Sequence, residues 1–180
     1  MSQESLHRLE DAISACRLCP LGYSRTLAVP GAGPAPARLM LVGEAPGREE
    51  DLSGKPFVGR AGRLLDRALE QAGLDRSEIF ITSVIKCRPP DNRKPLKKET
   101  ASCLPYLEAQ MEIVRPKVVC LLGNTAAAAV LGRQGIQALR GRIWQERFAV
   151  TYHPAAVLRN RNLMADFVSD LERLNSLQDK

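Results

Sequence analysis

Short runs of branched apolar residues alternate along this chain with longer segments in which apolar residues recur at every third or fourth position. The apolar runs at residues 38–43, 79–85, 117–123 and 148–152 predict buried strands. The segments that follow these runs have helical spacing. Because strands that alternate with helices form parallel sheets with both faces covered, we predict an α/β fold.

Apolar stripes and stop signals set the bounds of the helices. One stripe covers residues 64–72 and stops at Gly73, and another covers residues 104–114 and stops before Pro116. Asn124 is predicted to be the N-cap of an alanine-rich helix that ends near Gly132. Further stripes predict a first helix at residues 6–13 and a last one at residues 163–174. The glycine- and proline-rich residues 30–36 are predicted to be a spacer.

Polar and charged residues follow each predicted strand. These segments are residues 43–47, 86–90, 123–124 and 153–154. In open parallel sheets, ligands bind at the carboxyl ends of the strands. We therefore expect all four segments to meet at one edge of the domain and to form a site there.

The length and composition suit one globular unit. The chain has 180 residues, 44% of them hydrophobic, which is enough for one core, so we expect residues 1–180 to form a single domain. No run approaches the ~20 apolar residues of a membrane span, and the polar residues 1–16 lack the apolar core of a secretory signal. We expect a soluble cytoplasmic protein with no membrane contact.

The net charge of +6 is unevenly distributed. Residues 86–98 and residues 133–161 each carry six basic residues against one acidic residue, so together they carry +10 and leave −4 for the rest. We expect both windows at the site edge. Such segregation is typical of a face that binds a polyanion, although a pair of solvated basic loops would give the same pattern.

The chain has five cysteines, which we expect to be reduced thiols or metal ligands. Cys16 and Cys19 have the C-x2-C spacing of metal-binding loops, and Cys87 and Cys103 are further candidates. Cys120 lies within an apolar strand and is predicted to be a core residue. Four thiols suffice for tetrahedral zinc or an iron–sulfur cluster, and the spacing favours neither.

Three motifs resemble those of family 4 uracil-DNA glycosylases. They are GEAPGREED with GKPFVG at residues 43–59, IKCRPPDNR at residues 85–93, and HPAAVLRN at residues 153–160. The resemblance runs in order from about Cys16 to Leu174. It implies a three-layer α/β/α sandwich around a short, mostly parallel four-stranded sheet, and excision of uracil from DNA in base excision repair. It also implies a [4Fe-4S] cluster on Cys16, Cys19, Cys87 and Cys103.

The resemblance assigns roles around a flipped uracil, since a base inside a duplex cannot be reached. Phe57 would stack on the base, and the backbone of Gly43, Glu44 and Ala45 would contact it. His153 would donate a hydrogen bond to uracil O2, where negative charge builds up as the N-glycosidic bond breaks.

Water activation and DNA contacts are assigned in the same way. Ala45 stands where other uracil glycosylases carry an acidic or amide general base, so we predict Glu44 or Glu50 in that role, with Asn92 in support. Leu158 would enter the duplex as a wedge. The residues predicted to bind phosphates are Lys86, Arg88, Arg93, Arg159 and Arg161.

Ser83 departs from the family pattern, which usually has an asparagine there to read the edge of uracil. A serine hydroxyl is shorter and rotates, whereas an amide donates and accepts in a fixed plane. We predict weaker discrimination against cytosine, slower excision, or tolerance of another deaminated base such as hypoxanthine. Alternatively, a water molecule or Asn92 replaces the missing amide.

Other interpretations belong to different classes. A damage-binding protein of the same fold would hold uracil-DNA with little turnover, but the short residues 91–98 lack the histidine-rich insertion of such relatives. A generic nucleotide-binding module is disfavoured because no glycine-rich phosphate loop occurs. We expect a nucleoid-associated monomer that acts on single- or double-stranded DNA, and a sliding clamp is a further candidate partner.

Overall fold

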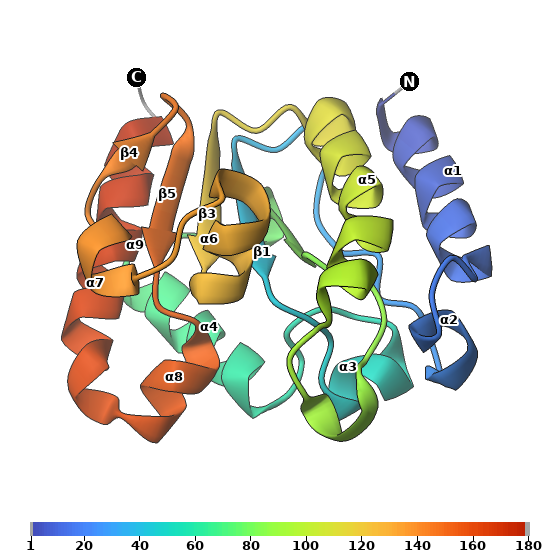
Figure 1. Cartoon of the computed structure of the whole chain (residues 1–180). Coiled ribbons are helices and arrows are strands. Elements are labelled where there is room, and N and C mark those ends of the chain that lie inside the picture. The colour runs from blue at the N-terminus through green and yellow to red at the C-terminus, as the bar shows by residue number, and fades with distance from the viewer. Residues whose placement is uncertain (1, 179–180) are drawn as a thin grey trace.

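A sheet of five strands lies at the centre of the computed structural model, which describes residues 2–178 (Figure 1). Its order is β2-β1-β3-β5-β4. The strands are β1 (Leu39–Gly43), β2 (Ile79–Ser83), β3 (Val118–Leu122), β4 (Ile143–Trp144) and β5 (Phe148–Thr151). The predicted parallel strands are confirmed, because β1 pairs in parallel with β2 and β3, and β3 pairs in parallel with β5.

Strand β4 was not predicted. It runs antiparallel to β5, with Ile143 opposite Ala149 and Trp144 opposite Phe148. Two residues among charged and polar neighbours give no apolar run, so the sequence pattern carries no signal for this strand. The sheet therefore has five strands where we expected four, with the same parallel core.

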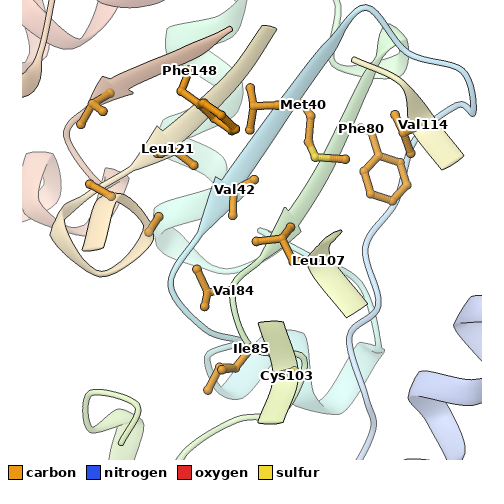
Figure 2. Packing of buried hydrophobic residues seen from close by; sticks show 14 of the residues in the cluster. Met40, Val42, Phe80, Val84, Ile85, Cys103, Leu107, Val114, Leu121 and Phe148 are labelled. Atoms are coloured by element: carbon orange, nitrogen blue, oxygen red, sulfur yellow. The ribbon is translucent and has the colours of Figure 1, made fainter. Parts of the chain in front are cut away.

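Alternate residues of the strands face opposite layers of helices. Met40 and Val42 of β1 belong to one buried cluster, and Leu39 and Leu41 belong to the other. Figure 2 shows the first cluster, in which Leu107 lies among side chains from the strands. Because both faces are buried under helices, the predicted three-layer α/β/α sandwich is confirmed.

The helices divide between the two faces. The first cluster draws residues from α1 (Ser2–Ala15), α2 (Leu21–Ser24), α5 (Lys97–Val114), α6 (Asn124–Leu131) and α7 (Ile136–Leu139). The second draws them from α4 (Arg60–Gln71), α8 (Pro154–Arg159) and α9 (Met164–Gln178). Helix α3 (Arg48–Ser53) follows β1 at the lower edge of Figure 1. Short 3-10 turns cover Arg76–Glu78, Pro90–Asn92 and Arg161–Leu163.

Two local predictions need adjustment. Gly123 rather than Asn124 is the N-cap of α6, and Asn124 accepts a hydrogen bond from Gly135 N at 2.9 Å. Residues 30–36 are not a free spacer, because Ala32 pairs antiparallel with Ile81 on the outer edge of β2. This bridge covers an edge that would otherwise expose unpaired backbone groups.

No helix within residues 2–178 has the length and apolar character needed to cross a bilayer.

Candidate functional site

The carboxyl end of β1 lies directly against two candidate side chains. A Cβ atom built at Gly43 would lie 2.6 Å from Phe57 Cζ and 3.2 Å from Ser83 Oγ. Phe57 and Ser83 are both buried. Because glycine has no side chain, the ring and the hydroxyl can both approach the backbone of β1 closely. Gly43, Phe57 and Ser83 therefore meet at the carboxyl end of β1.

Phe57 occupies a backbone conformation that few non-glycine residues adopt. Its φ is +50°, in the left-handed region. Gly62, in the first turn of α4, leaves room for this conformation, because a Cβ there would lie 1.8 Å from Phe57 O. The surrounding chain thus holds Phe57 in a strained turn against β1.

Glu50 builds the loop that carries Phe57. Its Oε1 accepts hydrogen bonds from Val58 N and Gly59 N at 2.9 Å, and its Oε2 accepts one from Gly47 N at 3.1 Å. Gly47 and Gly59 are the N-caps of α3 and α4. Glu50 therefore connects the starts of two helices, whereas we expected either Glu44 or Glu50 to activate water.

His153 follows β5 and is oriented by the backbone of α8. Its Nδ1 accepts a hydrogen bond from Ala155 N at 3.1 Å, so the ring proton of the neutral form is on Nε2. Burial, followed by the charge of Arg159, lowers the pKa of His153 to about 4, while the charge of Glu50 opposes this shift. The ring centroid lies 5.7 Å from that of Phe57. At neutral pH this imidazole is an uncharged donor beside the aromatic ring.

Gly123 makes the approach of His153 possible. A Cβ at this glycine would lie 2.9 Å from His153 Cβ. Gly123 also has a φ of +93°, which L side chains rarely adopt. The glycine that follows β3 thus faces the histidine that follows β5.

Glu44 is half-buried where β1 meets α6. Its Oε2 accepts a short hydrogen bond from the hydroxyl of Thr125, in the first turn of α6. Its carbonyl accepts one from Ile85 N at 3.2 Å. Ala45 beside it packs against the first core cluster. The carboxylate is thus fixed at the predicted edge, and Thr125 is a contact that the sequence did not reveal.

The contacts of Asn92 involve none of the groups described above. It is exposed, and its Oδ1 accepts a hydrogen bond from Arg88 Nε at 2.7 Å. Asp91 and Asn92 both have a φ of +53°, which these two residue types tolerate. The side chain of Asn92 therefore orients Arg88, and no described contact brings it to Glu44 or His153.

The prediction that Lys86 binds phosphate is wrong. The residue is 1% exposed, and its Nζ donates hydrogen bonds to Thr82, Ser83 and Gln110. Burial lowers its pKa to about 7, and the Cys103 and Cys87 thiols oppose that shift. A side chain enclosed in this way does not reach DNA.

Other basic side chains are engaged within the protein. Both Arg93 Nη atoms donate to the two Glu99 carboxylate oxygens, at 2.9 and 2.7 Å. This contact, followed by that of Leu96 N, lowers the pKa of Glu99 against the effect of burial. Arg140 pairs with Asp166 and Asp170. The charge of these arginines is thus largely balanced within the fold.

The second basic window does not lie wholly at the site edge. The carbonyl of Arg147 accepts a hydrogen bond from Val119 N at the amino end of the sheet. Arg159 and Arg161 are exposed around the end of α8, next to the segment that carries His153. Leu158 is half-buried against the second core cluster. Arg88, Arg159 and Arg161 remain the candidates for phosphate contacts.

The cysteines gather between the N-terminal segment, the turn after β2 and α5. Arg25 Nη1 donates to Cys87 Sγ at 2.8 Å, and Lys86 N donates to Cys103 Sγ at 3.3 Å. Burial raises the pKa of Cys87 and of Cys103, and the charge of Cys16 raises both further. These thiols therefore lie within electrostatic range of one another.

Tyr106 on α5 belongs to the same group of residues. A hydrogen bond with Cys16, followed by burial, raises the pKa of Tyr106 to about 12.

Within residues 2–178, no group of three or more His, Cys, Asp or Glu side chains is arranged to hold a single metal ion. The donor set of thiols that accept N–H hydrogen bonds fits an iron–sulfur cluster, whose sulfur atoms commonly accept such bonds. No sequence pattern indicated that Arg25 and Tyr106 contact the cysteines. Cys120 is buried in β3, as predicted.

Comparison with known proteins agrees with these motifs. Residues 30–175 match the model of the uracil DNA glycosylase superfamily. The chain is 44% identical to a Type-4 uracil-DNA glycosylase of Pyrobaculum aerophilum, over 92% of this chain and 91% of that protein. It is 41% identical to one of Archaeoglobus fulgidus, over 98% and 95%. It is 38% identical to one of Thermotoga maritima, over 99% and 97%.

The lowered pKa of His153 predicts a pH dependence of stability. An unfolded histidine takes up a proton near pH 6.5, whereas folded His153 does so only near pH 4. As the pH falls between these values, the unfolded state binds more protons, so the free energy of unfolding decreases. His153→Asn, which keeps an N-cap acceptor for α8, should flatten this decrease in urea titrations.

The exposed His7 on α1 provides the matched control. His7→Asn also removes a histidine but from an exposed position, and its slope is compared with that of His153→Asn. Equal slopes for the wild type and His153→Asn would contradict the assignment.

Proposed function

This chain belongs to the uracil DNA glycosylase superfamily, and from that membership we infer that it flips uracil out of DNA and hydrolyses its N-glycosidic bond. It is a uracil-DNA glycosylase that starts base excision repair. The observation that carries the assignment is the meeting of Phe57, Ser83 and His153 around Gly43 and Gly123. We propose that one domain provides all of these groups.

The base pocket is proposed to lie along the end of β1. The buried face of Phe57 would stack on uracil, and the backbone of Gly43, Glu44 and Ala45 would contact its polar edge. The small residues Gly43 and Ala45 allow the backbone to approach a base closely. The contact of Gly43 with Phe57 and Ser83 supports this position for the pocket.

His153 is proposed to stabilise the leaving uracil. Its Nδ1 accepts the Ala155 N–H, which leaves Nε2–H as the donor. A fixed, desolvated donor at uracil O2 stabilises the negative charge that grows there as the bond breaks. Because its lowered pKa keeps the ring neutral at pH 7, the donor needs no prior protonation.

Glu44 is the carboxylate that the geometry favours for the sugar. Cleavage gives the sugar oxocarbenium character, which a nearby negative charge stabilises, and a carboxylate can orient the attacking water. The Thr125 hydroxyl holds Glu44 Oε2 at the pocket edge, whereas both Glu50 oxygens accept backbone N–H groups. We therefore propose Glu44 for this role and Glu50 as the brace of the loop.

DNA is proposed to cross the edge that carries α8. Arg88, Arg159 and Arg161 would contact phosphates, which position the enzyme without reading sequence. Leu158 would fill part of the gap left by the flipped base. We also propose action as a monomer in the cytoplasm, at the nucleoid. A sliding clamp contact stays a prediction.

A [4Fe-4S] cluster is proposed on Cys16, Cys19, Cys87 and Cys103. When bound, the cluster would tie the N-terminal segment to the turn after β2. The hydrogen bonds of Arg25 to Cys87 and of the Lys86 backbone to Cys103 support this site.

Excision by the purified chain tests the function. With oligonucleotides that carry one uracil, single- or double-stranded, alkali should cleave more than one equivalent of strand. His153→Asn should lower kcat by about 100- to 1000-fold, because a preorganised donor to the leaving group is lost. His7→Asn should retain wild-type turnover. Retained complexes without strand cleavage would instead support the damage-binding protein of the same fold.

Ser83→Asn tests base selection. Since an amide reads uracil with a donor and an acceptor at once, this change should raise the preference in kcat/KM for uracil over hypoxanthine by at least about tenfold. Ser169→Asn on the exposed face of α9 is the control. An unchanged rate and preference in Ser83→Asn would show that another group reads the base.

Cysteine variants test the cofactor. Cys16→Ser and Cys103→Ser should lose visible absorbance together with iron and acid-labile sulfide, because each would remove a ligand. Cys120→Ala in β3 should keep all three signals. Full iron content in Cys103→Ser would exclude that residue from the site.

A further inference from the structure

Lys86 is the centre of a buried group of hydrogen bonds at the end of β2. Its Nζ donates hydrogen bonds to Ser83 O at 2.6 Å, and to Thr82 Oγ1 and Gln110 Oε1 at 2.7 Å. In its charged form Nζ carries three N–H donors, which matches the three acceptors around it. A fully satisfied buried amine of this kind fixes the geometry of the groups around it.

The acceptors of Lys86 connect three segments that are distant in sequence. Thr82 lies on β2 and Gln110 on α5, and both donate a hydrogen bond to Pro30 O at 2.7 Å. The same Pro30 belongs to the segment that bridges β2 through Ala32. Lys86 therefore holds the end of β2 against α5 and the segment around residue 30.

The backbone of Lys86 extends these connections. Its N–H donates to Cys103 Sγ at 3.3 Å, and its carbonyl accepts from Val29 N at 2.8 Å. Cys87 follows directly in sequence. One residue thus contacts the cysteine group through its backbone and the end of β2 through its side chain.

The side-chain contact closes the turn from Ser83 to Lys86. Within this turn, Val84 N donates to Gly43 O at 2.9 Å, and Ile85 N donates to Glu44 O at 3.2 Å. Ser83 Oγ itself lies against Gly43. By donating a hydrogen bond to Ser83 O, Lys86 Nζ fixes the position of Ser83, whose hydroxyl faces Gly43 and Phe57.

We propose that Lys86 is a positioning residue for base recognition, which fixes the turn from Ser83 to Lys86 so that the Ser83 hydroxyl faces the flipped base. The proposal rests on the assignment of Ser83 to the uracil pocket. It gives this lysine a task different from contact with phosphate and from simple support of the core.

Lys86→Met removes the donors and keeps most of the side-chain volume. Positioning predicts that kcat for uracil excision falls by about 10- to 100-fold, that KM and its salt dependence stay within about twofold, and that the preference for uracil over hypoxanthine decreases. The visible absorbance should be retained. Lys117→Met, an exposed lysine at the amino end of β3, controls for the loss of one charge.

Two outcomes would overturn the proposal. Phosphate contact predicts a raised KM, a shallower salt dependence and an unchanged kcat. Simple support of the core predicts lower stability with unchanged kcat and base preference. Thr82→Val removes one acceptor of Lys86 and leaves the lysine itself in place. It should lower kcat by a smaller factor than Lys86→Met does. This variant therefore tests the proposal even if Lys86→Met fails to fold.

A double-mutant cycle with Ser83→Ala identifies the route of the effect. If Lys86 acts through Ser83, Lys86→Met should change kcat and base preference much less in the Ser83→Ala background than in the wild type. Additive effects of the two substitutions would overturn the proposal for Lys86 but leave the proposed function standing. An unchanged base preference in Ser83→Ala itself would also remove Ser83 from the proposed pocket, and a wild type that releases no uracil would overturn the proposed function.

Discussion

The whole site depends on the absence of a side chain at Gly43. A Cβ atom there would lie 2.6 Å from the Phe57 ring, so any other residue would displace the aromatic face from the end of β1. The same device recurs nearby, because Gly62 makes room for the carbonyl of Phe57 and Gly123 makes room for His153. The proposed base pocket is thus bordered by backbone that approaches side chains more closely than L residues with a Cβ allow.

Such close packing has an energetic cost, which the surrounding structure offsets. A non-glycine residue in the left-handed region costs about 1–3 kcal/mol, and Phe57 is held there. Glu50 compensates by accepting N–H groups from Gly47, Val58 and Gly59. Hydrogen bonds to a charged acceptor each contribute about 1.5–3 kcal/mol. The loop therefore keeps its shape before any base arrives, which is the preorganisation that catalysis requires.

The parts of this arrangement that follow local patterns could be predicted from the sequence. Apolar runs located the four parallel strands, and the ends of the predicted strands located Gly43, Glu44 and His153 at one edge. Ser83 lay inside the predicted second strand, so only the family resemblance pointed to it, and β2 in fact ends at this residue. Strand β4 has only two residues and no apolar run, so no pattern revealed it. The brace role of Glu50 also escaped prediction, because its partners are backbone N–H groups whose positions only the folded loop defines.

The number of cations available to DNA was the feature that the basic windows of the sequence predicted least well. A lysine in a basic window is expected at the surface, but Lys86 finds acceptors on Ser83 and Gln110 once β2 and α5 come together. Arg93 is likewise matched by Glu99. Fewer cations thus remain for DNA than the windows implied. Phosphate contacts alone would bind any DNA, so under the proposed assignment discrimination comes from the base pocket, where the geometry of Ser83 and the donor of His153 would decide which base is released.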